Sequence, residues 1–234
     1  MHLSPEDAVV EFAELSLVLL PSGAVSNNAH QVMFVADVHL GKAATYRQLG
    51  QPVPQGTTTQ TLNQLSADIK RYKPNHLIVL GDFLHGPLIR RSRATLDAIA
   101  QWRAAHKSLQ ITLICGNHDA AAGDPPSEFE IELVDEPFKY ASISCCHEAQ
   151  RSDLQPTEFM MCGHIHPVAV LHGRARERLR LACFVVGPKR LVLPAYGAFT
   201  GGHVYKPAPD ETMYVLADQQ VFKLPGSRSV SCQP

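Results

Sequence analysis

Short apolar runs recur along the whole chain and predict strands. Each run is shorter than a typical helix, and several are rich in β-branched residues, which favours extended structure. The runs lie at residues 15–20, 32–36, 77–80, 111–115, 141–146, 159–162, 181–186, 190–193 and 213–216. Their spread along the chain indicates that most of the core is built from strands.

Two segments in the first half of the chain show helical spacing instead. Residues 57–72 place three aliphatic side chains at helical intervals before Pro74, and residues 90–106 show the same pattern. The segments 41–56 and 120–128 lack any period and contain Gly and Pro, so they predict loops.

Helix and strand alternate only in this first half, because strands and turns dominate from about Ile131 onward. The pattern predicts an α/β fold in which two packed sheets carry helices on the outside of at least one sheet. We find no internal repeat, low-complexity tract or linker, so we expect a single domain over residues 1–234.

Composition narrows the class of protein. Hydrophobic residues make up 45% and charged residues 18% of the chain, which is typical of a globular protein. The net charge of −1 excludes a globally basic nucleic-acid binder but allows a local basic patch. Six cysteines form no C-x-x-C pair and predict buried thiols in a reducing compartment. The acidic N-terminus is unlike a signal peptide and no run could span a bilayer, so we expect a cytoplasmic protein without membrane contact.

Polar residues with metal-binding side chains follow five of the predicted strands. Carboxyl ends of neighbouring parallel strands border the crevice where ligands bind in open α/β sheets, so these residues are expected to converge. They are Asp37, His39, Asp82, Asn117, His147, His164 and His166. The alternative is that these groups are buried and simply hydrogen-bond one another.

The number and type of these residues favour a metal site. Imidazole and carboxylate ligands suit first-row divalent ions, and the absence of cysteine ligands argues against structural zinc. Seven ligands are too many for one ion and fit two ions that share one carboxylate. Such a pair activates water for displacement at phosphorus, so the pattern indicates phosphoester hydrolysis.

The sequence resembles the calcineurin-like metallophosphoesterase superfamily. Five motifs carry the resemblance in order: D-x-H from Asp37, G-D at Asp82, G-N-H-D around Asn117, a lone His147, and G-H-x-H from His164. The resemblance implies a four-layer αββα sandwich of two mixed β-sheets. It also implies that one ion is held by Asp37, His39, Asp82 and His166, and the other by Asp82, Asn117, His147 and His164, with Asp82 bridging the two.

The same resemblance implies catalytic roles for two further residues. His118 is similar to the family's residue that stabilises the transition state or protonates the leaving oxygen. The alternative for His118 is a group that only orients Asp82. Asp119 is then a candidate to orient the His118 imidazole.

A narrower resemblance concerns the substrate. The second motif lacks the arginine of protein Ser/Thr phosphatases, which disfavours that class. The stretches 37–58 and 193–202 are similar to the ligase-associated DNA damage response endonuclease (PdeM-type) family, and the likeness covers nearly the whole chain. Membership would imply a nuclease acting in DNA repair beside an ATP-dependent DNA ligase, a helicase and an exonuclease.

Several residues are candidates for substrate binding. Lys42, Tyr46 and Arg47 follow the first predicted ligands, where a cation could hold a phosphate and a tyrosine could stack on a base. His85 lies just after Asp82 and is expected near the substrate. Arginines alternate from 174 to 180 and could track a phosphate backbone, although a solvated outer face of a hairpin is the favoured explanation.

The sequence therefore predicts a dinuclear-metal-dependent phosphodiesterase or endonuclease that hydrolyses phosphodiester bonds, with DNA as the expected substrate. The metal we expect is Mn²⁺, with Fe²⁺, Zn²⁺, Co²⁺ and Ni²⁺ as alternatives, because the same ligands accept several ions. Two other functions remain open: hydrolysis of a small cyclic or dinucleotide diester, and a scaffold that kept the fold but recruits partners.

Overall fold

The first sheet is formed by strands from the N-terminal part of the chain. The structure is a computed structural model that describes residues 6–148, 158–172 and 177–225. Seven strands pair in chain order: β1 (Ala8–Phe12), β2 (Leu15–Leu19), β3 (Val25–Asn27), β4 (Val32–Val35), β5 (His76–Leu80), β6 (Gln110–Ile114) and β7 (Glu132–Val134). Pairing is antiparallel from β1 to β4 and parallel from β4 to β7. The carboxyl ends of β4, β5 and β6 therefore lie side by side.

The second sheet is also mixed. Among the described residues its path runs β14 (His203–Val204), β11 (Pro167–His172), β12 (Arg178–Val186), β13 (Arg190–Val192), β10 (Phe159–Cys162), β9 (Ile143–Cys146) and β8 (Phe138–Tyr140). Off this path, β15 (Thr212–Ala217) pairs with β12 and with β16 (Gln220–Lys223). Strands β9 and β10 are parallel, so their carboxyl ends also meet.

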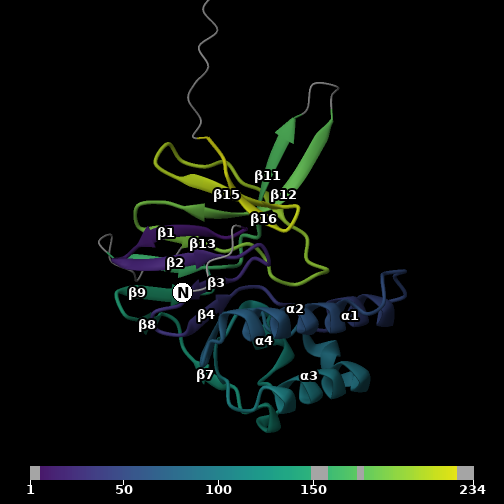
Figure 1. Cartoon of the computed structure of the whole chain (residues 1–234). Helices are drawn as coiled ribbons and strands as arrows, with labels where there is room; N and C mark the ends of the chain where they lie inside the picture. Colours follow the sequence, from purple (N-terminus) through teal and green to yellow (C-terminus); the bar gives the residue numbers. More distant parts are fainter. Residues whose placement is uncertain (1–5, 149–157, 173–176, 226–234) are drawn as a thin grey trace, which may run out of the picture.

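The helices pack on one face of the first sheet (Figure 1). They are α1 (Lys42–Gln48), α2 (Thr57–Tyr72), α3 (Arg93–Ala105) and α4 (Asn117–Ala122), with the 3₁₀ turns η1 (Pro87–Arg91) and η2 (Ser127–Phe129). Side chains alternate across each strand. In β4, Met33 and Val35 pack with the helices, whereas Phe34 packs between the two sheets.

Helices cover only one of the two sheets in the part of the chain that is described. The outer face of the second sheet carries a small cluster that includes Cys162, Cys183 and Val192, and Tyr205 and Leu224 pack against it. The mixed α/β architecture with two sheets matches the expectation, but the described layers are helices, sheet and sheet. The helical layer expected on the second sheet is not seen in these residues, because strands and loops cover that face.

All nine predicted strand runs are strands, and the helix predicted at 57–72 has those bounds. The segment predicted as helix over 90–106 is divided into η1 and α3. Two loop predictions were wrong in part: 41–56 contains α1, and 120–128 contains the end of α4 and most of η2. Helix α1 has seven residues and buries only Ala43 and Thr45, so it leaves no apolar period to detect.

None of the helices in the described ranges combines the length and apolar character needed to cross a bilayer.

Replacing Phe34 with alanine tests the packing between the sheets. The Phe34 ring is fully buried and lies edge-on to Tyr140, with 5.0 Å between ring centroids. We expect Phe34→Ala to lower the free energy of unfolding by about 3–5 kcal/mol, because it opens a cavity in the core. Urea denaturation measures the change, and Phe222→Ala, at a ring that is 43% exposed, should cost less than about 1 kcal/mol. Equal losses of unfolding free energy in the two variants would contradict the burial of Phe34 between the two sheets.

Candidate metal centre

The seven predicted ligands converge at the carboxyl ends of strands from both sheets. Asp37 and His39 follow β4, Asp82 follows β5, Asn117 follows β6, His147 follows β9, and His164 and His166 follow β10. The two sheets are joined there by hydrogen bonds. The backbone N–H of His164 donates to Asp37 Oδ2 at 2.8 Å, and His147 Nδ1 lies 3.1 Å from the Leu80 carbonyl oxygen.

Five of the seven residues have left-handed backbone. The φ angles are 54° at Asp37, 48° at His39, 52° at Asp82, 66° at His164 and 47° at His166. Positive φ is uncommon for residues other than glycine, and it clusters at functional sites where the surrounding structure enforces it. Here it turns the chain sharply after β4, β5 and β10, the three strands that these five ligands follow.

Glycines next to the ligands allow the close approach of the backbone. A Cβ at Gly81 would overlap the His147 ring, and a Cβ at Gly116 would overlap Asp82. Gly81 also has φ of +80°, which disfavours any side chain there. The glycines of the G-D and G-N-H-D motifs are therefore needed to bring the strand ends together.

One group of ligand atoms lies around Asp37. His166 Nε2 is 3.1 Å from Asp37 Oδ1, and Asp37, His39 and His166 form a group with the geometry to hold a metal ion. His39 Nε2 is 3.7 Å from Asp82 Oδ2. These residues are the four that the family resemblance implies for one ion.

A second group lies around His147. Its Nε2 atom is 3.1 Å from Asn117 Oδ1, 3.0 Å from His164 Nδ1 and 3.6 Å from Asp82 Oδ1. Asp37, Asp82 and His147 form another group that could hold an ion. The two oxygens of Asp82 thus face His39 on one side and His147 on the other, which is the placement expected of a shared carboxylate.

Burial supports the presence of cations in this space. Asp37 is fully buried and Asp82 is 2% exposed, yet Asp37 Oδ1 and His39 Nε2 have no hydrogen-bond partner among the described residues. A buried carboxylate oxygen without a partner is costly, and a metal ion removes the cost. The residues present therefore fit a metal centre.

The His39 imidazole is held in the neutral form that a metal requires. Burial lowers the pKa of His39 well below its ordinary value, and the positive charge of Lys42 adds to this effect. A neutral ring keeps a lone pair for coordination, whereas a protonated ring cannot bind a cation. Asn117 and His164 are exposed, so the centre opens to solvent on their side.

Comparisons with known proteins agree with this geometry. A model of the calcineurin-like phosphoesterase family matches residues 30–178, which include all seven candidate ligands. The chain belongs to the calcineurin-like phosphoesterase family. It is a metal-dependent phosphoesterase, with buried His and Asp clusters that fit metal ions.

Among solved structures, this phosphoesterase is similar to the nuclease MPE of Pseudomonas putida. The two chains are 39% identical, the match covers 93% of this chain and 100% of that chain, and the TM-score is 0.80. A phosphoesterase from E. coli, Yfce, is 13% identical over 81% of this chain and 95% of that chain, with a TM-score of 0.42. No curated protein matches the chain.

A third group of candidate ligands consists of histidines, and the sequence predicted only part of it. His39, His85 and His118 also form a group that could hold an ion. The rings of His85 and His118 are stacked with centroids 4.4 Å apart, and His85 Nδ1 lies 3.2 Å from His39 Nδ1. Burial lowers the pKa of His85 to about 4 and also lowers the pKa of His118. His85, expected only near the substrate, is thus in direct contact with a candidate ligand.

Asp119 forms hydrogen bonds with the backbone of two loops. The Asp119 carboxylate accepts backbone N–H groups from Phe83 at 3.2 Å, Leu84 at 2.8 Å and Gly116 at 3.1 Å. It makes no hydrogen bond to His118 within the described part of the chain. Asp119 therefore ties the loop after β5 to the loop after β6, and its orientation of the His118 ring stays a prediction.

The residues predicted to bind substrate line two different cavities. Lys42 and Tyr46 line one cavity together, and the Tyr46 ring lies nearly parallel to His85, 6.2 Å away. Burial lowers the pKa of Lys42, while Asp82 and Asp37 oppose the shift. Arg47 instead lines a different cavity and donates from Nη1 to the Pro54 carbonyl at 2.7 Å.

The arginine pattern is described only at its end. Arg174 and Arg176 lie outside the described residues. Arg178 and Arg180 are exposed and two positions apart in β12, so they share a face of the strand. Arg180 Nη2 donates to the Gly202 carbonyl at 2.8 Å.

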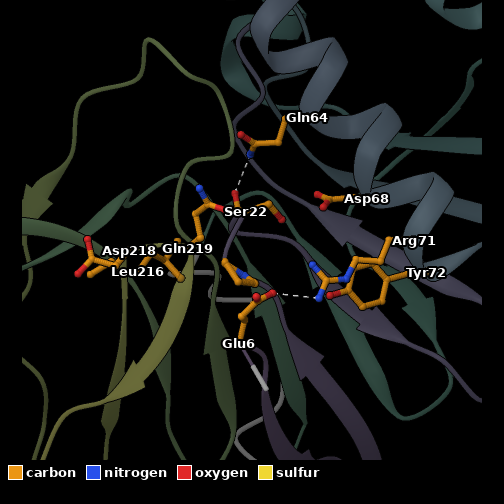
Figure 2. Close-up of a pocket in the computed structure, with 11 residues that line it drawn as sticks. Glu6, Ser22, Gln64, Asp68, Arg71, Tyr72, Leu216, Asp218 and Gln219 are labelled. Atoms are coloured by element: carbon orange, nitrogen blue, oxygen red, sulfur yellow. Dashed lines mark hydrogen bonds and ion pairs between the residues drawn. The ribbon is translucent and has the colours of Figure 1, made fainter. Parts of the chain in front are cut away.

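A second large cavity contains none of the predicted ligands (Figure 2). Its volume is about 490 Å³, and it is lined by Glu6, Pro21, Ser22, Gln64, Asp68, Arg71, Tyr72 and residues 216–219. Its one lining cation, Arg71, is already paired among the described residues, because Arg71 Nη2 lies 3.1 Å from Glu6 Oε2. The metal centre, not this cavity, carries the chemistry.

The hydrogen bonds of Asp119 to the backbone of two loops predict a pH-dependent contribution to the free energy of unfolding. Burial raises the pKa of Asp119 from its ordinary 3.8 to about 6, against the pull of its backbone donors. The pKa of Asp119 is higher in the folded protein than in the unfolded chain. The stabilisation that Asp119 gives the folded protein is therefore complete below about pH 4 and is lost as the pH rises through about 6. The difference in unfolding free energy between wild type and Asp119→Asn should shrink by about 2–3 kcal/mol from pH 4 to 7.

Urea denaturation of metal-stripped protein at several pH values measures that difference. Asp97→Asn is the matched control, because Asp97 lies on the surface of α3 beside Arg93. A pH-independent difference between wild type and Asp119→Asn would show that Asp119 is not a buried titrating group.

Proposed function

We propose that the protein is a dinuclear-metal-dependent phosphodiesterase that acts as an endonuclease on DNA. The observation that carries the proposal is the convergence of seven intact ligand residues around Asp82, in a chain that is 39% identical to a nuclease. A scaffold protein has no need of two buried carboxylates surrounded by imidazoles, so hydrolysis explains the centre better.

For the ligands we propose the two sets that the family resemblance implies. One ion would be held by Asp37, His39, Asp82 and His166, and the other by Asp82, Asn117, His147 and His164. The short distances from His166 to Asp37 and from His147 to Asn117 support these two sets. Bound divalent ions would supply the Lewis acidity that activates water and offsets charge on the phosphoryl oxygens.

His118 is suited to assist departure of the leaving sugar oxygen. Its backbone N–H, rather than its ring, donates to Asp82 Oδ1 at 2.9 Å. The alternative role of orienting Asp82 is therefore met by the main chain, which leaves the half-buried ring available for proton transfer. The Lys42 ammonium, which interacts with both Asp37 and Asp82, would add positive charge beside the phosphate.

Manganese is the metal we propose, with Fe²⁺, Zn²⁺, Co²⁺ and Ni²⁺ as alternatives. The ligand atoms are imidazole nitrogens and carboxylate or amide oxygens, which suit ions of this class. Burial raises the pKa of Cys145 and Cys162 above the ordinary thiol value, so both stay protonated. A thiolate from these residues does not compete for the ion.

We propose a role in DNA repair on the basis of the resemblance to the ligase-associated endonuclease family. The DNA substrate is supported by the nuclease relative. An ATP-dependent DNA ligase, a helicase and an exonuclease are the protein partners that such a system would include.

Hydrolysis by metal-stripped protein resupplied with Mn²⁺ tests the function. The substrates are an aryl phosphodiester, an aryl phosphomonoester, and labelled single-stranded and double-stranded DNA at two salt concentrations. We expect Mn²⁺-dependent cleavage of the diester and of DNA, and weaker DNA cleavage at high salt because polymer binding releases counterions. Diester hydrolysis without DNA cleavage would instead indicate a small-nucleotide enzyme, and bound metal without turnover would indicate a scaffold.

Replacing Asp82 with asparagine tests the proposal that Asp82 is a ligand shared by two ions. The change keeps the side-chain shape but removes the charge that faces His39 and His147. We expect kcat to fall at least about 100-fold and Mn²⁺ affinity, measured by calorimetry, to fall at least about tenfold. Asp97→Asn is the surface control. An Asp82→Asn protein that binds two ions and retains wild-type activity would overturn the assignment.

A further inference from the structure

A cavity lies directly beside the metal centre and has no role in metal binding. Its volume is about 490 Å³, within the usual range of about 300–1,000 Å³ for ligand pockets. Helix α1 contributes Lys42 and Tyr46 to its wall, and the segment 198–201 contributes the rest. Lys42 is the only charged residue among the described residues that line it.

Two aromatic rings form a right-angled corner in this cavity. The rings of Tyr46 and Phe199 are 6.2 Å apart between centroids and meet at 84°. A flat ligand lying on one ring would touch the edge of the other, which is the geometry that aromatic pairs prefer. The remaining lining residues, Ala198, Thr200 and Gly201, are small, so the corner is accessible to a planar group.

The corner is fixed in position relative to the metal ligands. His166 Nδ1 lies 3.1 Å from the Gly201 carbonyl oxygen, which joins the 198–201 segment to a predicted ligand. On the other wall, Tyr46 packs against His85, and His85 stacks on His118. A group seated in the corner is thus held at a defined place beside any phosphate at the metal centre.

We propose that this corner, formed by Tyr46 and Phe199, binds one nucleobase of the nucleotide next to the scissile phosphate. A nucleobase is favoured over a sugar or a second phosphate because two of the described lining residues are aromatic and their one cation, Lys42, interacts electrostatically with Asp37 and Asp82. A base can enter only after it has left its neighbours in the stack. The inference rests on the proposed cleavage of DNA and adds a binding site to it.

A comparison of two oligomers isolates the contribution of the base. One is an oligothymidylate, and the other has the same number of phosphates but abasic deoxyribose analogues throughout, so the backbone charge is equal. We expect wild-type kcat/KM to favour the oligothymidylate about tenfold. Phe199→Ala and Tyr46→Ala should each lower that ratio toward one, whereas Tyr46→Phe and Phe199→Tyr, which keep a ring, should retain it.

Binding measured without turnover separates this inference from the proposed function. Fluorescence anisotropy of both oligomers with metal-stripped protein should show the same preference for bases and its loss in Phe199→Ala. The control is Phe222→Ala, at an exposed ring on β16. Loss of all cleavage with the binding preference intact would refute only the nuclease function. Equal binding and cleavage of the two oligomers, or a preference that survives both alanine variants, would overturn the base-binding corner.

Discussion

The two buried carboxylates of Asp37 and Asp82 are the constraint on which the centre depends. Both lie out of contact with water, where an ionised group is costly unless charges or donors surround it. The main chain meets part of that requirement, with the N–H of His164 on Asp37 and the N–H of His118 on Asp82. The Oδ1 atom of Asp37 accepts no hydrogen bond from the described residues, and the nearest cationic candidate is His166 Nε2 at 3.1 Å. Cation binding and the local fold are therefore energetically linked at this point.

The ligands around the buried carboxylates are brought together by backbone conformations that are themselves unfavourable. Left-handed conformations at residues other than glycine each cost about 1–3 kcal/mol and persist only when their surroundings enforce them. Here the enforcement comes from rigid strands on both sides and from Asp119, whose carboxylate holds two loops together through three backbone donors. The apolar layer between the sheets supplies the stability that offsets this strain.

Much of this arrangement could be predicted from the sequence, because strand ends and ligand types are local signals. The runs before Asp37, Asp82 and His147 are strands in the structure, and the polar residues after them do converge. Helix α1 could not be predicted, because two small buried side chains leave no periodic pattern.

The partners of Asp119 and Arg47 could not be predicted either. Both residues bond to backbone groups elsewhere in the chain, and the sequence of side chains does not show which backbone groups will lie nearby. The similarity over 193–202 marked the segment that holds Phe199, but not the ring it faces.

The aromatic corner draws on two parts of the chain that differ in their relation to the family. Tyr46 lies inside the stretch 30–178 that matches the family model, whereas Phe199 and its segment lie beyond it. The residues that would carry out hydrolysis and one wall of the recognition site are thus encoded separately. A substitution in the 198–201 segment would therefore change the proposed base contact without replacing any of the seven candidate ligands.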